Sequence, residues 1–130
     1  MSKEQARRWL QEAVGNQEIN FRSGQWEAID AIVNRHQRLL VVEKTGWGKS
    51  IVYFLSARLL RQNRPDALTI VVSPLISLMR NQIEQAERIQ VNAVTINASN
   101  TDDWQQHFQV LRVLLGASAI PLTATNFSVV

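Results

Sequence analysis

The chain has 130 residues, 45% of them hydrophobic, which is enough to bury one hydrophobic core and argues against disorder. It contains no cysteine, and His36 and His107 stand without neighbouring ligands, so disulfides are excluded and a metal site built from side chains alone is not expected. The net charge of +3 is compatible with a polyanionic partner but does not by itself indicate one. The sequence has no apolar stretch long enough to span a membrane and no apolar core of a signal peptide, which predicts a cytoplasmic protein.

The first half of the chain predicts two helices, a strand and a third helix. Apolar residues recur at helical spacing from Ala6 to Val14, and again from Trp26 to Val33 after the stretch NFRSG. The apolar run from Leu39 to Val42 predicts a short strand buried on both faces, as in parallel sheets. A helix is predicted from about Lys49, with basic residues near its end, where they favour the helix dipole.

The second half continues the alternation of strands and helices. The stretch ALTIVVS (67–73) predicts a second buried strand, NAVTINA (92–98) a third strand and AIPLTAT (119–125) a fourth. Ser73 and Pro74 supply an N-cap and a first-turn proline for a helix to about Ile89, and NTDDW opens another helix. This order predicts an α/β fold with a mostly parallel sheet flanked by helices.

The stretch KTGWGKS (44–50) lies between the first predicted strand and the third predicted helix. Gly46 and Gly48 allow successive N–H groups to face one concavity, to which the helix start adds its positive dipole end. Phosphate is the natural ligand of such a nest. Lys49 would reach the β and γ phosphates, and the Ser50 hydroxyl would ligate a Mg²⁺ ion that bridges them.

This loop nearly matches the phosphate-binding pattern G-x-x-x-x-G-K-[ST]. Glu43 stands where the first glycine belongs, while T-G-x-G-K-S is retained from Thr45 to Ser50, with Trp47 at the variable position. The structural alternative is a glycine turn with an exposed lysine.

Three stretches together resemble a known family. FRSGQWEAI (21–29), KTGWGKS (44–50) and SPLISLMRNQ (73–82) are similar, in this order, to the first three motifs of RecQ-like superfamily 2 DNA helicases. The likeness is strongest over residues 18–100 and resumes at IPLTATN (120–126). It implies that residues 1–130 form a partial N-terminal RecA-like, P-loop NTPase domain that uses ATP and Mg²⁺.

The resemblance also implies roles for single residues around the nucleotide. Gln25 would hydrogen-bond the adenine edge, and Arg22 would pack near the base. Trp26 beside them is better explained as a core residue, because aromatic residues at helical spacing usually are.

Further roles concern DNA, which the family binds as a single strand or at an unwinding junction. The resemblance places Ser73 and Arg80 against a DNA phosphate. An ordinary capped helix is the structural alternative for this stretch. Thr123 and Thr125 would couple the nucleotide to the DNA, although a threonine-rich strand end also occurs without such a role.

The chain lacks the acidic hydrolysis motif of the family. Hydrolysis there needs a strand that ends in an acidic pair, which orients Mg²⁺ and the attacking water. Relatives carry this DExH box between the regions similar to NASNTDDW and IPLTATN, which only residues 105–119 separate here. The second RecA-like domain has no counterpart in these residues, so the predicted fold is incomplete. None of the acids after Ser50 follows a run of four apolar residues: Asp66, Glu84, Glu87, Asp102 and Asp103.

Three hypotheses for the function follow. The first is the ATP-binding portion of a RecQ-like DNA helicase, which couples ATP to DNA unwinding in intact relatives but is not expected to hydrolyse ATP or unwind DNA alone. The second is a non-catalytic module that binds nucleotide and DNA. The third is a small P-loop kinase, which leaves FRSGQ and SPLISLMRNQ unexplained.

Overall fold

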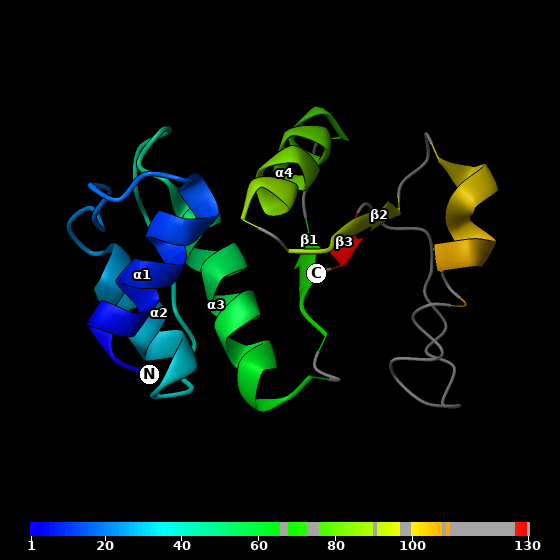
Figure 1. Ribbon diagram of the computed structural model, residues 1–130. Coiled ribbons are helices and arrows are strands. Elements are labelled where there is room, and N and C mark those ends of the chain that lie inside the picture. Colours follow the sequence, from blue (N-terminus) through cyan, green and yellow to red (C-terminus); the bar gives the residue numbers. More distant parts are fainter. Residues whose placement is uncertain are drawn as a thin grey trace.

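The computed structural model describes residues 1–65, 68–72, 76–89, 91–96, 100–107, 109 and 127–129. Three helices form one end of the molecule, and a fourth helix and a small sheet lie beside them (Figure 1). The elements are α1 (Lys3–Val14), α2 (Gln25–Val33), α3 (Lys49–Asn63), β1 (Ile70–Val72), α4 (Ile76–Arg88), β2 (Val94–Ile96), the 3₁₀ turn η1 (Thr101–Asp103) and β3 (Phe127–Val129). The predicted helices over these ranges and the strands at β1 and β2 are confirmed.

Local signals set the ends of the first helices. The Ser2 hydroxyl accepts a hydrogen bond from the Gln5 N–H at 3.2 Å and caps the start of α1. Gly15 ends α1 in the left-handed conformation, with φ of 71°, which glycine adopts without a steric cost. Trp26 is half-buried beside the core and lies 6.0 Å from the Phe21 ring, as expected for a core-facing aromatic residue.

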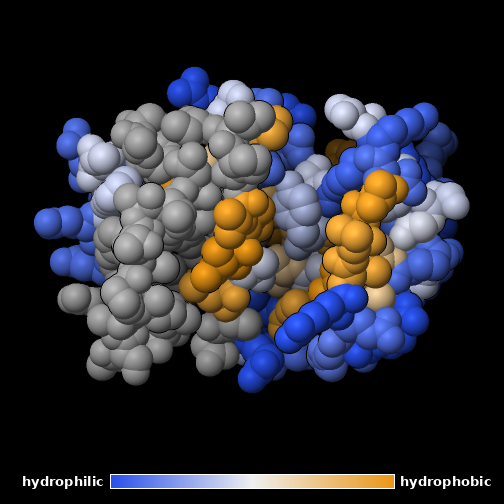
Figure 2. Space-filling model, turned by 180° about the vertical axis from the view of Figure 1, so that it is seen from behind, coloured by the Kyte–Doolittle hydropathy of each residue, from blue (hydrophilic) through white to orange (hydrophobic). Residues whose placement is uncertain are grey.

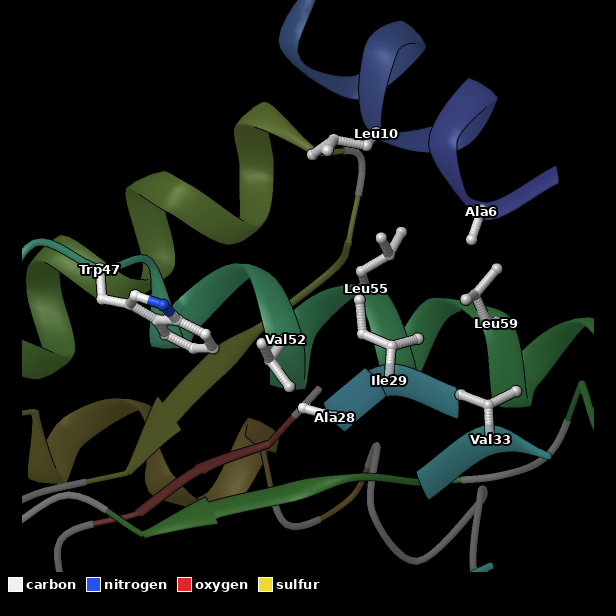
Figure 3. Packing of buried hydrophobic residues seen from close by; sticks show 9 residues of the cluster. All are labelled: Ala6, Leu10, Ala28, Ile29, Val33, Trp47, Val52, Leu55 and Leu59. Carbon is white, nitrogen blue, oxygen red and sulfur yellow. The ribbon is translucent and has the colours of Figure 1, made fainter. Parts of the chain in front are cut away.

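Helix α3 occupies the centre of the packing, because it buries side chains on two sides. On one side its residues meet α1 and α2 in the cluster of Figure 3, and on the other they meet α1 and α4. The first cluster contains Ala6, Leu10, Ala28, Ile29, Val33, Trp47, Val52, Leu55 and Leu59. The second contains Ala13, Phe54, Ala57, Ala86, Ile89 and Val91. Trp47, which lies in the loop before α3, belongs to the first cluster, and it therefore fixes this loop to the core.

The sheet differs from the predicted one. Its order is β1-β3-β2, and β3 pairs antiparallel with both neighbours, with Val71 and Thr95 each opposite Ser128. The prediction of a mostly parallel sheet is therefore wrong for the described strands. A continuous apolar run favours a strand covered on both faces but does not fix the direction of its neighbour, and the pairing strand β3 carried no clear sequence signal.

The prediction of a buried strand from Leu39 to Val42 is also wrong in this structure. This segment has no sheet partner among the described residues, and the side chains of Leu40 and Val42 are 87% and 82% exposed. Ile70 and Val72 of β1 are exposed as well, so the prediction that this strand is buried is wrong, although the strand itself is present. Figure 2 shows apolar side chains reaching the surface at two separate places on the face opposite that of Figure 1. An apolar run forms a buried strand only where neighbouring strands supply hydrogen bonds and cover.

Some predicted features lie outside the described residues. These are the predicted strand at 119–125, the N-cap Ser73 with Pro74, and the two threonines Thr123 and Thr125. In the part of the chain that the structure describes, none of the helices has the length and apolar character needed to cross a membrane.

Candidate functional site

Two loops meet where α2 and α3 begin. The first (residues 22–24) leads into α2 and the second (residues 43–48) leads into α3; we call them the base loop and the phosphate loop. The Arg22 guanidinium donates to the carbonyl of Gly46, and the indole Nε1 of Trp47 donates to the carbonyl of Ser23 at 3.2 Å. Residues predicted from two separate motifs to bind one ligand therefore lie together.

Gln25, the first residue of α2, joins the loops from the inside. Its side chain is buried, with 2% of the residue exposed. The carboxamide Nε2 donates to the carbonyls of Trp47 and Gly48 at 3.0 and 3.3 Å, and Oε1 accepts from the Arg22 N–H at 2.8 Å. Both ends of the carboxamide are therefore engaged within the protein. The predicted contact of Gln25 with adenine stays a prediction.

Trp47 anchors the phosphate loop in the core. It is 9% exposed, and its ring extends from the loop towards Val52 of the main cluster (Figure 3). The ring also packs on the base loop, since a Cβ added at Gly24 would lie 3.5 Å from Cζ2 of the indole. The sequence placed Trp47 in the phosphate loop but did not reveal this anchoring role. An aromatic residue between two loop glycines was the available signal.

The conformation of the phosphate loop depends on its two glycines. Gly46 and Gly48 have φ of 84° and 98°, a region that disfavours residues with a Cβ atom. Gly48 is the N-cap of α3 and provides no side-chain cap. Among the described residues, the backbone N–H groups of Gly48, Lys49 and Ser50 have no hydrogen-bond acceptor. These donors, with the positive end of the α3 dipole, suit a phosphate group.

The remaining predicted residues of the phosphate loop lie at its rim. The Lys49 ammonium donates to the carbonyl of Glu43 and, at 3.0 Å, to that of Lys44. These two carbonyls use two of the three N–H donors of the ammonium. Thr45 is exposed, and Ser50 is half-buried in the first turn of α3. Glu43, at the position of the missing glycine, contributes its carbonyl to the loop.

The predicted DNA-contacting and coupling residues are not assembled by the described structure. Arg80 is exposed on α4. Ser73, Thr123 and Thr125 lie outside the described residues, so their predicted roles stay predictions.

Comparison with protein families agrees with the paired loops. A model of the DEAD/DEAH box helicases matches residues 22–125, which include both the base loop and the phosphate loop. The chain belongs to the DEAD/DEAH box helicase family. The resemblance to RecQ-like helicases is confirmed, and family membership implies a P-loop, RecA-like fold.

Individual relatives support the same conclusion. The chain is 43% identical over 90 residues to the ATP-dependent DNA helicase RecQ of Haemophilus influenzae and 40% identical over 82 residues to that of Bacillus subtilis. It is 51% identical over 63 residues to the ATP-dependent DNA helicase Q4 of Mus musculus. These matches cover 69%, 63% and 48% of this chain but only 14%, 13% and 5% of the relatives. No solved structure gives a significant match.

Proposed function

We propose that residues 1–130 are part of the N-terminal RecA-like domain of a RecQ-like DNA helicase and bind ATP with Mg²⁺. The observation that carries this proposal is the start of α3, where the N–H groups of Gly48, Lys49 and Ser50 have no acceptor among the residues described and both loop glycines are left-handed. The family match and the contact between the two loops support it. The same match favours a helicase over the small P-loop kinase.

The residues of the phosphate loop divide the work of holding a triphosphate. The N–H groups of Gly48, Lys49 and Ser50 donate to phosphate oxygens, and the Lys49 ammonium adds a point charge. The Ser50 hydroxyl would hold Mg²⁺, which would supply positive charge to neutralise the phosphates. Arg22, which the resemblance places near the base, donates to the phosphate loop from the base loop.

We propose binding without turnover for this chain alone. Phosphoryl transfer needs carboxylates that hold the metal and the attacking water, and the sequence offers no acidic pair at the end of an apolar strand. Asp102 and Asp103 lie in the exposed turn η1. A non-catalytic module that binds nucleotide and DNA therefore describes the chain itself, and the coupling of ATP to unwinding belongs to intact relatives.

DNA is the proposed macromolecular partner. Arg80 is exposed on α4, and the net charge of the chain is +3. A contact between Arg80 and a DNA phosphate would release counterions, so DNA affinity should fall steeply as salt is added. Arg80→Ala should reduce this salt dependence. Salt-independent binding would contradict a phosphate contact.

Nucleotide binding tests the proposal directly. A fluorescent ATP analogue with Mg²⁺ is titrated into the wild type, Lys49→Ala and Lys44→Ala, which removes an exposed lysine from the same loop. Loss of one charge-assisted contact of about 2 kcal/mol should weaken binding about thirtyfold in Lys49→Ala only. Equal affinity of all three proteins would remove the phosphate loop from the function. ATPase activity above background that depends on Lys49 would refute binding without turnover.

A further inference from the structure

The side chain of Gln25 contacts the phosphate loop rather than solvent. This contact indicates a role other than the predicted one at adenine. We propose that Gln25 is a positioning residue for phosphate binding, which turns the N–H groups of Gly48 and Lys49 towards the ligand by holding the carbonyls before them. The inference rests on the proposed function, because it assumes that the phosphate loop binds phosphate. It differs from the predicted role of Gln25 at the adenine edge.

The geometry of the peptide bond carries the argument. In a planar trans peptide, the carbonyl of one residue and the N–H of the next point in opposite directions. Gln25 Nε2 donates to the carbonyls of Trp47 and Gly48. The N–H groups of the same two peptides belong to Gly48 and Lys49, and they therefore point away from Gln25. These two belong to the group of three N–H donors at the start of α3 that have no acceptor among the described residues. One side chain thus orients adjacent donors to the same side.

The carboxamide is itself held in one orientation. Its Oε1 accepts from the Arg22 N–H at 2.8 Å, which leaves Nε2 facing two carbonyls that only a donor can satisfy. The side chain is buried, so loss of these bonds cannot be replaced freely by water. The space is also closed on the side of Gly48, where an added Cβ would lie 2.6 Å from Nε2. Gln25 is therefore built into the loop as part of its support.

The two assignments predict different responses to a ligand without a base. If Gln25 acts on the loop, its removal weakens inorganic tripolyphosphate and nucleotides alike. If Gln25 acts on adenine, its removal leaves tripolyphosphate affinity unchanged and abolishes the preference for ATP over GTP. Donation to adenine would also require Nε2 to release a carbonyl, because both of its N–H groups are already engaged.

Calorimetric titration with tripolyphosphate, ATP and GTP separates these cases. The proteins are the wild type, Gln25→Ala, Gln25→Met, which keeps the buried volume without a donor, and the control Gln62→Ala, an exposed residue of α3. Loss of two hydrogen bonds of ordinary strength should weaken all three ligands by about thirtyfold in both Gln25 variants. The control should bind as the wild type does.

A pH profile separates positioning from a general loss of structure. Gln25→Glu can accept from Arg22 in its ionised form but donates to a carbonyl only when protonated. Relative to the wild type at each pH, its tripolyphosphate affinity should recover as the pH is lowered, while thermal unfolding shows that the variants are folded.

The outcomes distinguish this inference from the proposed function. Unchanged tripolyphosphate affinity in both Gln25→Ala and Gln25→Met, with loss of ATP preference, would overturn the positioning role alone. A wild type that binds none of the three ligands would overturn the proposed function and the inference with it.

Discussion

Replacing Gly48 with alanine tests the contact between Gln25 and the phosphate loop through the stability of the protein. Two costs are expected. A residue with a Cβ atom in the left-handed region costs about 1–2 kcal/mol, and φ of Gly48 is 98°. The new Cβ also meets Nε2 of Gln25 at 2.6 Å. Because Nε2 ends a side chain that can turn, this second cost is the loss of its two hydrogen bonds, about 1 kcal/mol each.

The chain offers two matched controls. Gly46 and Gly15 have φ of 84° and 71°, and an added Cβ at either position meets no atom within 4 Å. Gly46→Ala and Gly15→Ala should therefore show only the conformational cost of about 1–2 kcal/mol, whereas Gly48→Ala should lose about 3–4 kcal/mol. Urea denaturation gives the free energy of unfolding of each variant. If Gly48→Ala were no less stable than Gly46→Ala, the hydrogen bonds of Gln25 would not stabilise the loop.

Three further predictions concern the core and its surroundings. Trp47→Phe, which loses the hydrogen bond to Ser23 and part of the buried ring, should cost about 1–3 kcal/mol and Trp47→Ala about 3–5 kcal/mol in urea denaturation; equal losses would contradict the anchoring role. The Arg58 guanidinium lies 4.1 Å from the centre of the Trp9 ring, and a double-mutant cycle of Arg58→Met with Trp9→Leu should give a coupling of about 0.5–1 kcal/mol; zero coupling would exclude a cation–π contribution. Burial raises the pKa of the Tyr53 hydroxyl above its ordinary value of 10.0, against an opposing hydrogen bond with Gln82. Stability from this group is therefore complete below the unfolded pKa and lost as pH rises through the folded pKa. Thermal unfolding of Tyr53→Phe should depend less on alkaline pH than that of the wild type, and an equal dependence would assign the loss to other groups.

Helices and the phosphate loop were predictable from the sequence because their signals are local. Ser2 and Gly15 delimit α1 through contacts within a few residues. The left-handed conformations of Gly46 and Gly48 follow from the same spacing that identified the loop. Motif order also indicated that the base loop and the phosphate loop serve one ligand.

The sheet and the inner contacts of the site were not predictable in this way. Exposure of Leu40 and the antiparallel pairing of β1 depend on which strands are available as neighbours, and β3 follows β1 by more than fifty residues of sequence. A glutamine in a motif likewise does not show whether its carboxamide faces a ligand or a backbone carbonyl. Only the burial of Gln25 and its distances to Trp47 and Gly48 decide that for this structure.

The most direct test of the central claim follows the backbone amides themselves. Amide proton and nitrogen NMR shifts of the full chain are recorded while ATP and Mg²⁺ are added. We expect the largest changes at Gly48, Lys49 and Ser50, because their N–H groups have no acceptor within the described protein and face the proposed phosphate site. If these three resonances stayed in place while others moved, the phosphate loop would not be where the nucleotide binds.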